Sequence, residues 1–188
     1  HKNVTKEGNN FDNRPFNSLA EMHQYMKEKW NSKITNGDTV YILGDVSMRG
    51  KKEELIAFVA QLKGRKVLIK GNHDDVSDYR YQQLFHEICD YKEMHDTIGK
   101  EHYSLVLSHY PIFSWRNMGR GRILLYGHTH ESEEDRFYQK CLSEMRANDC
   151  RHVYEAEELR AYNVGCMRDY MNYTPRTLEE ILNSRSKV

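Results

Sequence analysis

Four short apolar runs in this chain each lead into side chains that can bind a metal ion or move a proton. The runs and the residues that follow them are Thr39–Leu43 with Gly44-Asp45, Lys66–Ile69 with Gly71-Asn72-His73-Asp74, Ser104–Leu107 with Ser108-His109, and Arg122–Tyr126 with Gly127-His128-Thr129-His130. Apolar runs of this length indicate buried strands. Because ligands in open α/β sheets collect outside the carboxyl ends of the strands, we expect these side chains to meet in one place.

The polar residues at these strand ends form a mixed set of metal donors. Asp45, Asn72, His109, His128 and His130 offer two oxygen donors and three imidazoles. Such a set suits a transition ion such as Mn, Fe or Zn better than Ca or Mg alone. Five ligands are too many for one ion that must also hold a water, so we expect two ions that share Asp45. Two ions about 3.5–4 Å apart can bind a phosphate, generate a hydroxide and stabilise an in-line displacement.

His73 and Asp74 are the candidate catalytic residues. His73 follows a ligand directly and is expected to protonate the leaving oxygen, while Asp74 holds its imidazole in one orientation. A polar turn after a strand is the simpler interpretation of Gly71–Asp74 taken alone.

Three further residues are candidates for substrate contacts: Arg14, Arg116 and the chain-end His1. Arg116 belongs to a loop that also carries Trp115 and Arg120, with Arg122 beside it. These residues predict either a patch that contacts phosphates or bases, or an ordinary solvated loop.

Several helices are expected to surround the strands. Capping boxes at Ser18–Glu21 and Thr177–Glu180 predict two helix starts. The expected helices begin after Ser18, carry Leu55 to Leu62 before Gly64, span Tyr79–Cys89 and Ser132–Ala147, and follow Thr177.

The strand order predicts a parallel sheet with an added hairpin. A strand, helix and strand between Thr39 and Ile69 form a βαβ unit, and so predict parallel pairing. Gly99-Lys100 divides Tyr91–Leu107 into a plausible hairpin. Short strands are also expected at Ala161–Val164 and Tyr170–Tyr173.

The ordered motifs from Asp45 to His130 are similar to those of the calcineurin-like metallophosphoesterase family, particularly its small bacterial and phage members. In those members a segment like Arg14-Pro15-Phe16 precedes the first helix. The resemblance implies an α/β (α+β) fold, a four-layer α/β/β/α sandwich with a dimetal site at the carboxyl ends of the strands. It also implies that Asp45 bridges two metals and that His73 acts on the leaving group, with Asp74 behind it. In that arrangement Asn72, His109 and His128 complete the shell of the second metal, and His130 serves the first.

The chain departs from the family pattern at its start. The family begins with a strand that ends in Asp-x-His, and this motif is absent here. His1-Lys2-Asn3 looks like the tail of that stretch. We therefore expect a short apolar strand ending in Asp-x-His just before His1, and we expect residues 1–188 to be one domain of this family without its first strand.

Composition narrows the partners and the compartment. The 188 residues carry 28 basic and 28 acidic side chains, so no overall charge draws the chain to nucleic acid, which would need a local site. No apolar run reaches membrane-spanning length. The four cysteines show no C-x-x-C spacing and indicate thiols in a reducing compartment, which favours the cytoplasm.

Two classes of function fit these observations. The first is a metal-dependent hydrolase that uses an activated hydroxide on small phosphomonoesters or phosphodiesters. The second is a metal-binding interaction scaffold of the same fold with little or no turnover. His73 favours the enzyme, because a scaffold has no need of a general acid. The sequence leaves the physiological substrate, the native metal and the oligomeric state open.

Overall fold

The structure is a computed structural model that describes residues 4–10, 12–47, 51–149 and 152–185. Its helices are α1 (Leu19–Lys33), α2 (Lys52–Ala60), α3 (Tyr79–Gln82), α4 (Glu133–Ala147) and α5 (Leu178–Arg185). Its strands are β1 (Thr39–Ile42), β2 (Arg65–Ile69), β3 (Glu87–Cys89), β4 (Tyr91–Ile98), β5 (Glu101–Ser108), β6 (Ile123–Tyr126) and β7 (Ala161–Asn163).

The strands form two sheets. The first has the order β1-β2-β3 and is entirely parallel, with Tyr41 opposite Val67 and Leu68 opposite Ile88. The second has the order β4-β5-β6-β7. In it β4 and β5 form the predicted antiparallel hairpin around Gly99-Lys100, whereas β5, β6 and β7 run parallel. The predicted parallel βαβ unit from β1 to β2 is confirmed.

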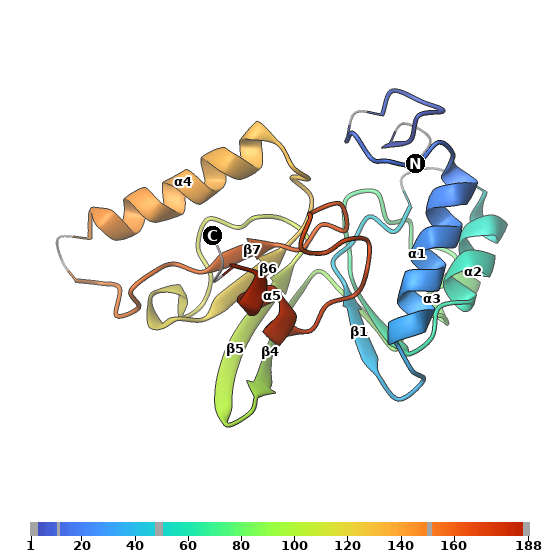
Figure 1. Cartoon of the computed structure of the whole chain (residues 1–188). Coiled ribbons are helices and arrows are strands. Elements are labelled where there is room, and N and C mark those ends of the chain that lie inside the picture. Colours follow the sequence, from blue (N-terminus) through green and yellow to red (C-terminus); the bar gives the residue numbers. More distant parts are fainter. Residues whose placement is uncertain (1–3, 11, 48–50, 150–151, 186–188) are drawn as a thin grey trace.

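The two sheets pack face to face, with helices on their outer sides. Apolar residues of β2, β5 and β6, among them Ile69, Leu107 and Ile123, share one buried cluster with α5. On the far face of the first sheet, Leu68 packs with Val59 of α2 and Tyr81 of α3. On the far face of the second sheet, β6 packs against α4, and Figure 1 shows α4 and α1 on opposite sides of the molecule. These layers confirm the predicted α/β/β/α arrangement.

Both predicted capping boxes begin helices where the sequence places them. At α1 the Ser18 hydroxyl accepts a hydrogen bond from the Glu21 N–H at 3.1 Å. At α5 the bonds are reciprocal, because the Glu180 N–H donates to Thr177 Oγ1 and the Thr177 N–H donates to the Glu180 carboxylate. Each box satisfies backbone donors that a helix start would otherwise leave free.

Two predicted elements are wrong. Tyr79–Cys89 is helical only over Tyr79–Gln82, because Glu87–Cys89 pairs with the open edge of β2 instead. Tyr170–Tyr173 is a turn and not a strand. Asn172 and Tyr173 have φ values of 46° and 53°, a left-handed conformation that an extended strand does not allow.

Two further observations concern the described residues only. None of the described helices has the length and apolar character needed to cross a membrane. Cys89, Cys141 and Cys166 are free thiols, in line with the sequence, and Cys150 lies outside the described residues.

Candidate metal centre

Four of the five predicted ligands converge just beyond the carboxyl ends of β1, β2, β5 and β6. His109 Nε2 lies 3.1 Å from Asn72 Oδ1, 3.2 Å from His128 Nδ1 and 3.5 Å from Asp45 Oδ2. A tetrahedral ion with bonds of 2.0–2.2 Å holds its ligand atoms about 3.3–3.6 Å apart. The three measured separations approach these edges, so the donor atoms fit one small cation in type and in spacing.

The imidazole of His109 is fixed from its other nitrogen. His109 is 1% exposed, and its Nδ1 lies 2.7 Å from the Leu43 carbonyl oxygen. Because a carbonyl only accepts, Nδ1 donates this bond and Nε2 faces the other three donor atoms. Burial alone would lower the pKa of His109, but Asp45 and the Leu43 carbonyl outweigh burial and raise it. The position of Nε2 therefore favours a positive charge, which a metal ion supplies in place of a proton.

The backbone is strained where three of the candidate ligands lie. Asp45, His128 and His130 have φ values of 53°, 63° and 52°. Residues other than glycine adopt this left-handed region at a cost of about 1–2 kcal/mol each. Strain held at several ligand positions is typical of a preorganised site.

Two glycines allow the loops after β1 and β2 to approach closely. A Cβ on Gly44 would lie 2.5 Å from both the Gly71 nitrogen and His109 Nδ1. A Cβ on Gly71 would lie 2.1 Å from Asp45 Oδ1. The spacing Gly44-Asp45 and Gly71-Asn72 thus places ligands of neighbouring strands in contact, which larger residues would prevent.

Comparison with known proteins identifies the family. Residues 12–164 match the calcineurin-like phosphoesterases. The chain belongs to the calcineurin-like phosphoesterase family. This confirms the resemblance of the ordered motifs, and it connects the site to metal-dependent hydrolysis of phosphoesters, which is the general chemistry of the family.

Individual matches come from a mycobacterial phage, from Methanocaldococcus jannaschii and, for the fold, from Aquifex aeolicus. The chain is 31% identical over 128 residues to the Gene 66 protein of Mycobacterium phage D29, a match that covers 56% of this chain and 64% of the phage protein. It is 28% identical over 138 residues to the uncharacterized protein MJ1445 of Methanocaldococcus jannaschii, covering 73% and 67% of the two chains. The match thus spans about two thirds of the length of these relatives. The crystal structure of AQ665, a protein of unknown function from Aquifex aeolicus, has the same fold, with a TM-score of 0.63 at 21% identity over 98% of this chain and 92% of that one.

In this calcineurin-like phosphoesterase, the Asp74 carboxylate contacts the backbone of two loops, and its expected support of the His73 ring stays a prediction. Its carboxylate accepts hydrogen bonds from the backbone N–H groups of Asp45, Val46 and Gly71 at 2.7–2.9 Å. Burial raises the pKa of Asp74, and the three backbone donors offset this only in part. Asp74 therefore holds the loops after β1 and β2 together.

His73 lies beside the ligands on an exposed part of the same loop. Its backbone N–H donates to Asp45 Oδ1 at 2.9 Å, and the residue lines the cleft that contains the metal centre. The hydrogen bond ties the position of His73 to the candidate bridging carboxylate.

The fifth predicted ligand, His130, contacts a residue that the sequence does not indicate. Its Nδ1 lies 3.0 Å from Asp12 Oδ2, although the two residues are 118 positions apart. Burial alone would raise the pKa of Asp12, but His130 and Arg14 outweigh burial and lower it. In the sequence, Asp12 lies in a polar N-terminal segment, and nothing there distinguishes it from an ordinary surface acid.

Asp135 is a second residue missing from the sequence prediction. Its buried carboxylate accepts hydrogen bonds from Tyr126, Thr129 and Asn163 at 2.7–3.0 Å. The same Asn163 amide donates to the His130 backbone oxygen. In the sequence, the helix dipole already accounts for acidic residues at the start of α4, so Asp135 does not stand out. In the structure it also anchors the loop that carries His128 and His130.

The three predicted substrate contacts are not brought together. Arg14 is buried and paired with Asp12 at 2.7 Å, and it lines the cleft, so its contact with substrate stays a prediction. Arg116 is exposed and paired with Glu93 on β4, outside the residues that line the cleft. Trp115 is buried, which removes it as a surface for stacking bases, and His1 lies outside the described residues.

A cleft of about 1010 Å³ begins at the metal centre and continues between the sheets and α1. Asp45, His73, His109, His128 and His130 line it together with many apolar side chains. β1 is the edge strand of its sheet and borders this cleft.

Proposed function

We propose that this phosphoesterase hydrolyses phosphomonoesters or phosphodiesters with two divalent transition-metal ions, Mn, Fe or Zn. The observation that carries the proposal is the convergence of Asp45 Oδ2, Asn72 Oδ1, His109 Nε2 and His128 Nδ1 at separations that suit one ion. We assign a second ion to Asp45 and His130, which line the same cleft. When bound, such ions polarise the phosphoryl oxygens and lower the pKa of a water ligand.

We assign metal binding, proton donation and loop positioning to different residues of the chain. Asp45, His109 and His128 would hold an ion beside the phosphoryl group. His73 donates a proton from its ring to the leaving oxygen, because it borders the same cleft and is not needed as a ligand. Asp74 keeps the loops after β1 and β2 in register, so that the ligands and the proton donor hold a fixed geometry.

We propose a small phosphorylated molecule as the substrate. The balanced charge of the chain provides no long-range attraction for nucleic acid, and the one loop expected to contact bases has its tryptophan buried. The ligand set serves monoesters and diesters equally well. A panel of nucleotides, cyclic dinucleotides and phosphopeptides therefore identifies the substrate class directly.

The test of the activity compares chromogenic monoesters and diesters with added Mn. We expect turnover above that of the metal alone. We expect His73→Asn to keep its metal content and to lose about 10²–10⁴-fold in turnover, with the larger loss on esters that have poor leaving groups. His102→Asn is the matched control, because His102 is exposed at the opposite end of β5 from His109 and should turn over normally.

Two results would contradict the proposal. Absence of turnover on both ester types, and on the panel, would favour the interaction scaffold. Equal losses in His73→Asn on good and poor leaving groups would show that His73 positions the substrate or stabilises charge, and does not donate a proton.

A further inference from the structure

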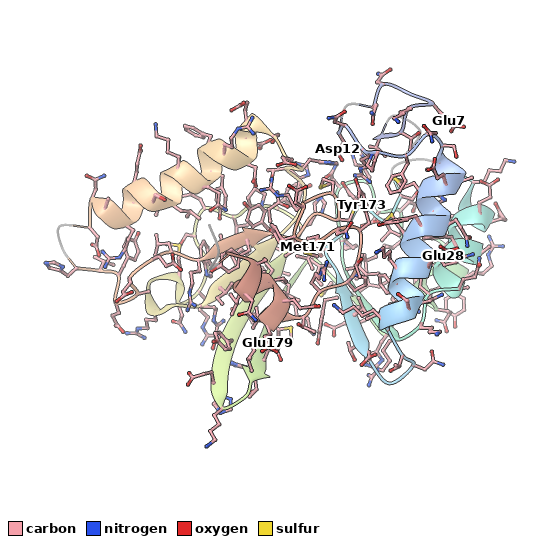
Figure 2. The ribbon with its side chains drawn as sticks, in the orientation of Figure 1. Glu7, Asp12, Glu28, Met171, Tyr173 and Glu179 are labelled. Carbon is pink, nitrogen blue, oxygen red and sulfur yellow. The ribbon has the colours of Figure 1, made fainter. Side chains whose placement is uncertain are left out.

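Asp12 is a buried acid that reaches the metal centre from outside the predicted motifs. Its side chain is 4% exposed and belongs to the N-terminal segment, where Figure 2 labels it. From there it contacts His130 in the loop after β6. A buried carboxylate is rare without partners, so its contacts indicate its role.

The partners of Asp12 determine which atom carries each proton. Arg14 Nε and Nη2 lie 2.8 Å and 2.7 Å from the same Oδ2 that contacts His130. A guanidinium can only donate, and it stays charged in proteins, so Asp12 is an ionised acceptor. The His130 Nδ1 therefore donates to Asp12, and in a neutral ring the proton on Nδ1 leaves Nε2 unprotonated.

We propose that Asp12 is a positioning residue of the metal centre, which fixes the Nδ1–H tautomer and the ring direction of His130 so that Nε2 binds an ion. The proposal rests on the dinuclear centre proposed above. Asp12 then holds one nitrogen of His130 as the Leu43 carbonyl holds one nitrogen of His109, and His130 lines the same cleft as the other ligands. Acceptors of this kind change metal affinity by about 10–100-fold.

His130 depends on this support more than His109 does. Its side chain is 32% exposed, whereas that of His109 is 1% exposed, so packing restrains its ring less. Arg14 in turn holds Asp12, and this explains why both members of the ion pair are buried. Asp12 is thus the residue of this segment that supports a ligand 118 positions away.

The first experiment needs no metal. Long-range ¹H–¹⁵N spectra of the metal-free protein in mildly alkaline buffer report which nitrogen of each imidazole carries the proton. We expect His130 in the Nδ1–H form in the wild type and a shift away from that form in Asp12→Ala. Asp12→Asn can still accept the hydrogen bond and should retain much of the Nδ1–H form. A His130 ring in the same form in the wild type and Asp12→Ala would overturn the proposal.

The second experiment titrates Mn or Zn and follows both equivalents by calorimetry. Asp12→Ala should weaken one of the two equivalents by about 10–100-fold and leave the other unchanged. Arg14→Met is the matched control, because it breaks the same buried ion pair and destabilises the fold but leaves the acceptor for His130. Equal weakening of metal affinity in Arg14→Met and Asp12→Ala would show that Asp12 is only a structural residue and would overturn the proposal. An equally large loss of affinity in Asp12→Asn and Asp12→Ala would overturn it as well.

These experiments separate this inference from the proposed function. A wild-type chain that binds a single ion would contradict the dinuclear centre, and the tautomer spectrum would still decide whether Asp12 fixes the Nδ1–H form of His130. A chain that binds two ions with equal affinity in wild type and Asp12→Ala would overturn the role of Asp12 alone.

Discussion

Substitution of Gly71 by alanine isolates the geometry of the metal centre from its chemistry. The new Cβ would lie 2.1 Å from Asp45 Oδ1 and 2.6 Å from the Asp45 nitrogen, and real Cβ atoms essentially never come closer than 3.0 Å. The Asp45 carboxylate would have to retreat by about 0.9 Å to reach that limit, whereas ligand distances in metal sites vary by only about 0.2 Å. The same movement would break the hydrogen bond from the His73 N–H to Oδ1.

We expect Gly71→Ala to lose metal and activity far more than it loses stability. Overpacking costs about 1–3 kcal/mol, which leaves an ordinary domain folded. A displacement near 1 Å at a reacting centre lowers the rate by about 10²-fold or more. Metal content by mass spectrometry, unfolding in urea and hydrolysis of a chromogenic ester measure the three effects on one preparation.

Gly37→Ala is the matched control for this experiment. Gly37 lies in the turn before β1, and its nearest neighbour would be 3.8 Å from the new Cβ, so the variant should match the wild type in all three measurements. Full metal content and normal turnover in Gly71→Ala would refute the assignment of Asp45 to the centre.

Three further predictions follow from the same contacts. Asp74→Asn replaces one acceptor oxygen by an amide group that faces backbone donors, and urea unfolding should show a loss of stability of about 1.5–3 kcal/mol. If this loss were no larger than that of Asp75→Asn, at the exposed end of the same loop, the role of Asp74 in holding the two loops together would be contradicted. Burial favours a higher pKa for Glu180, but Lys33 and the Thr177 N–H lower it, so its stabilisation is present above the unfolded pKa of about 4.3 and is lost as the pH falls through the folded value. Glu180→Gln should accordingly show a smaller fall in unfolding free energy between about pH 6 and pH 3 than the wild type, and parallel curves would count against the capping carboxylate. Saturating Mn at about 100 times its dissociation constant should stabilise the wild type by about 2.7 kcal/mol and should stabilise Asp45→Asn much less; equal thermal shifts in both would place the metal elsewhere.

The sequence predicts the features that depend on local pattern. An apolar run with a polar end determines both the strand and the residue that follows it, so the pattern alone places Asp45, Asn72, His109 and His128 at one edge of the strands. The capping boxes at Ser18 and Thr177 are local in the same sense, since both partners lie within four residues.

The features that the sequence does not predict depend on partners far along the chain. Glu87–Cys89 forms a strand because β2 offers it an open edge, which no periodicity within the segment reveals. Asp12 meets His130, and Asp135 meets Asn163, only after the sheets have packed. The sequence also does not predict the pairing of Arg14 with Asp12, because the two side chains are buried together only by contacts with other elements.

The left-handed backbone at Asp45, His128 and His130 also affects which residues are favoured at these positions during evolution. Glycine adopts this conformation without strain, and asparagine tolerates it better than histidine does, so selection for stability alone would replace these residues. Binding of an ion by this aspartate and these two histidines would offset that cost, whereas His152 and Tyr173 adopt the same conformation outside the centre. A relative that carries glycine or asparagine at the three positions would keep this backbone with less strain and would lack the carboxylate and imidazole donors.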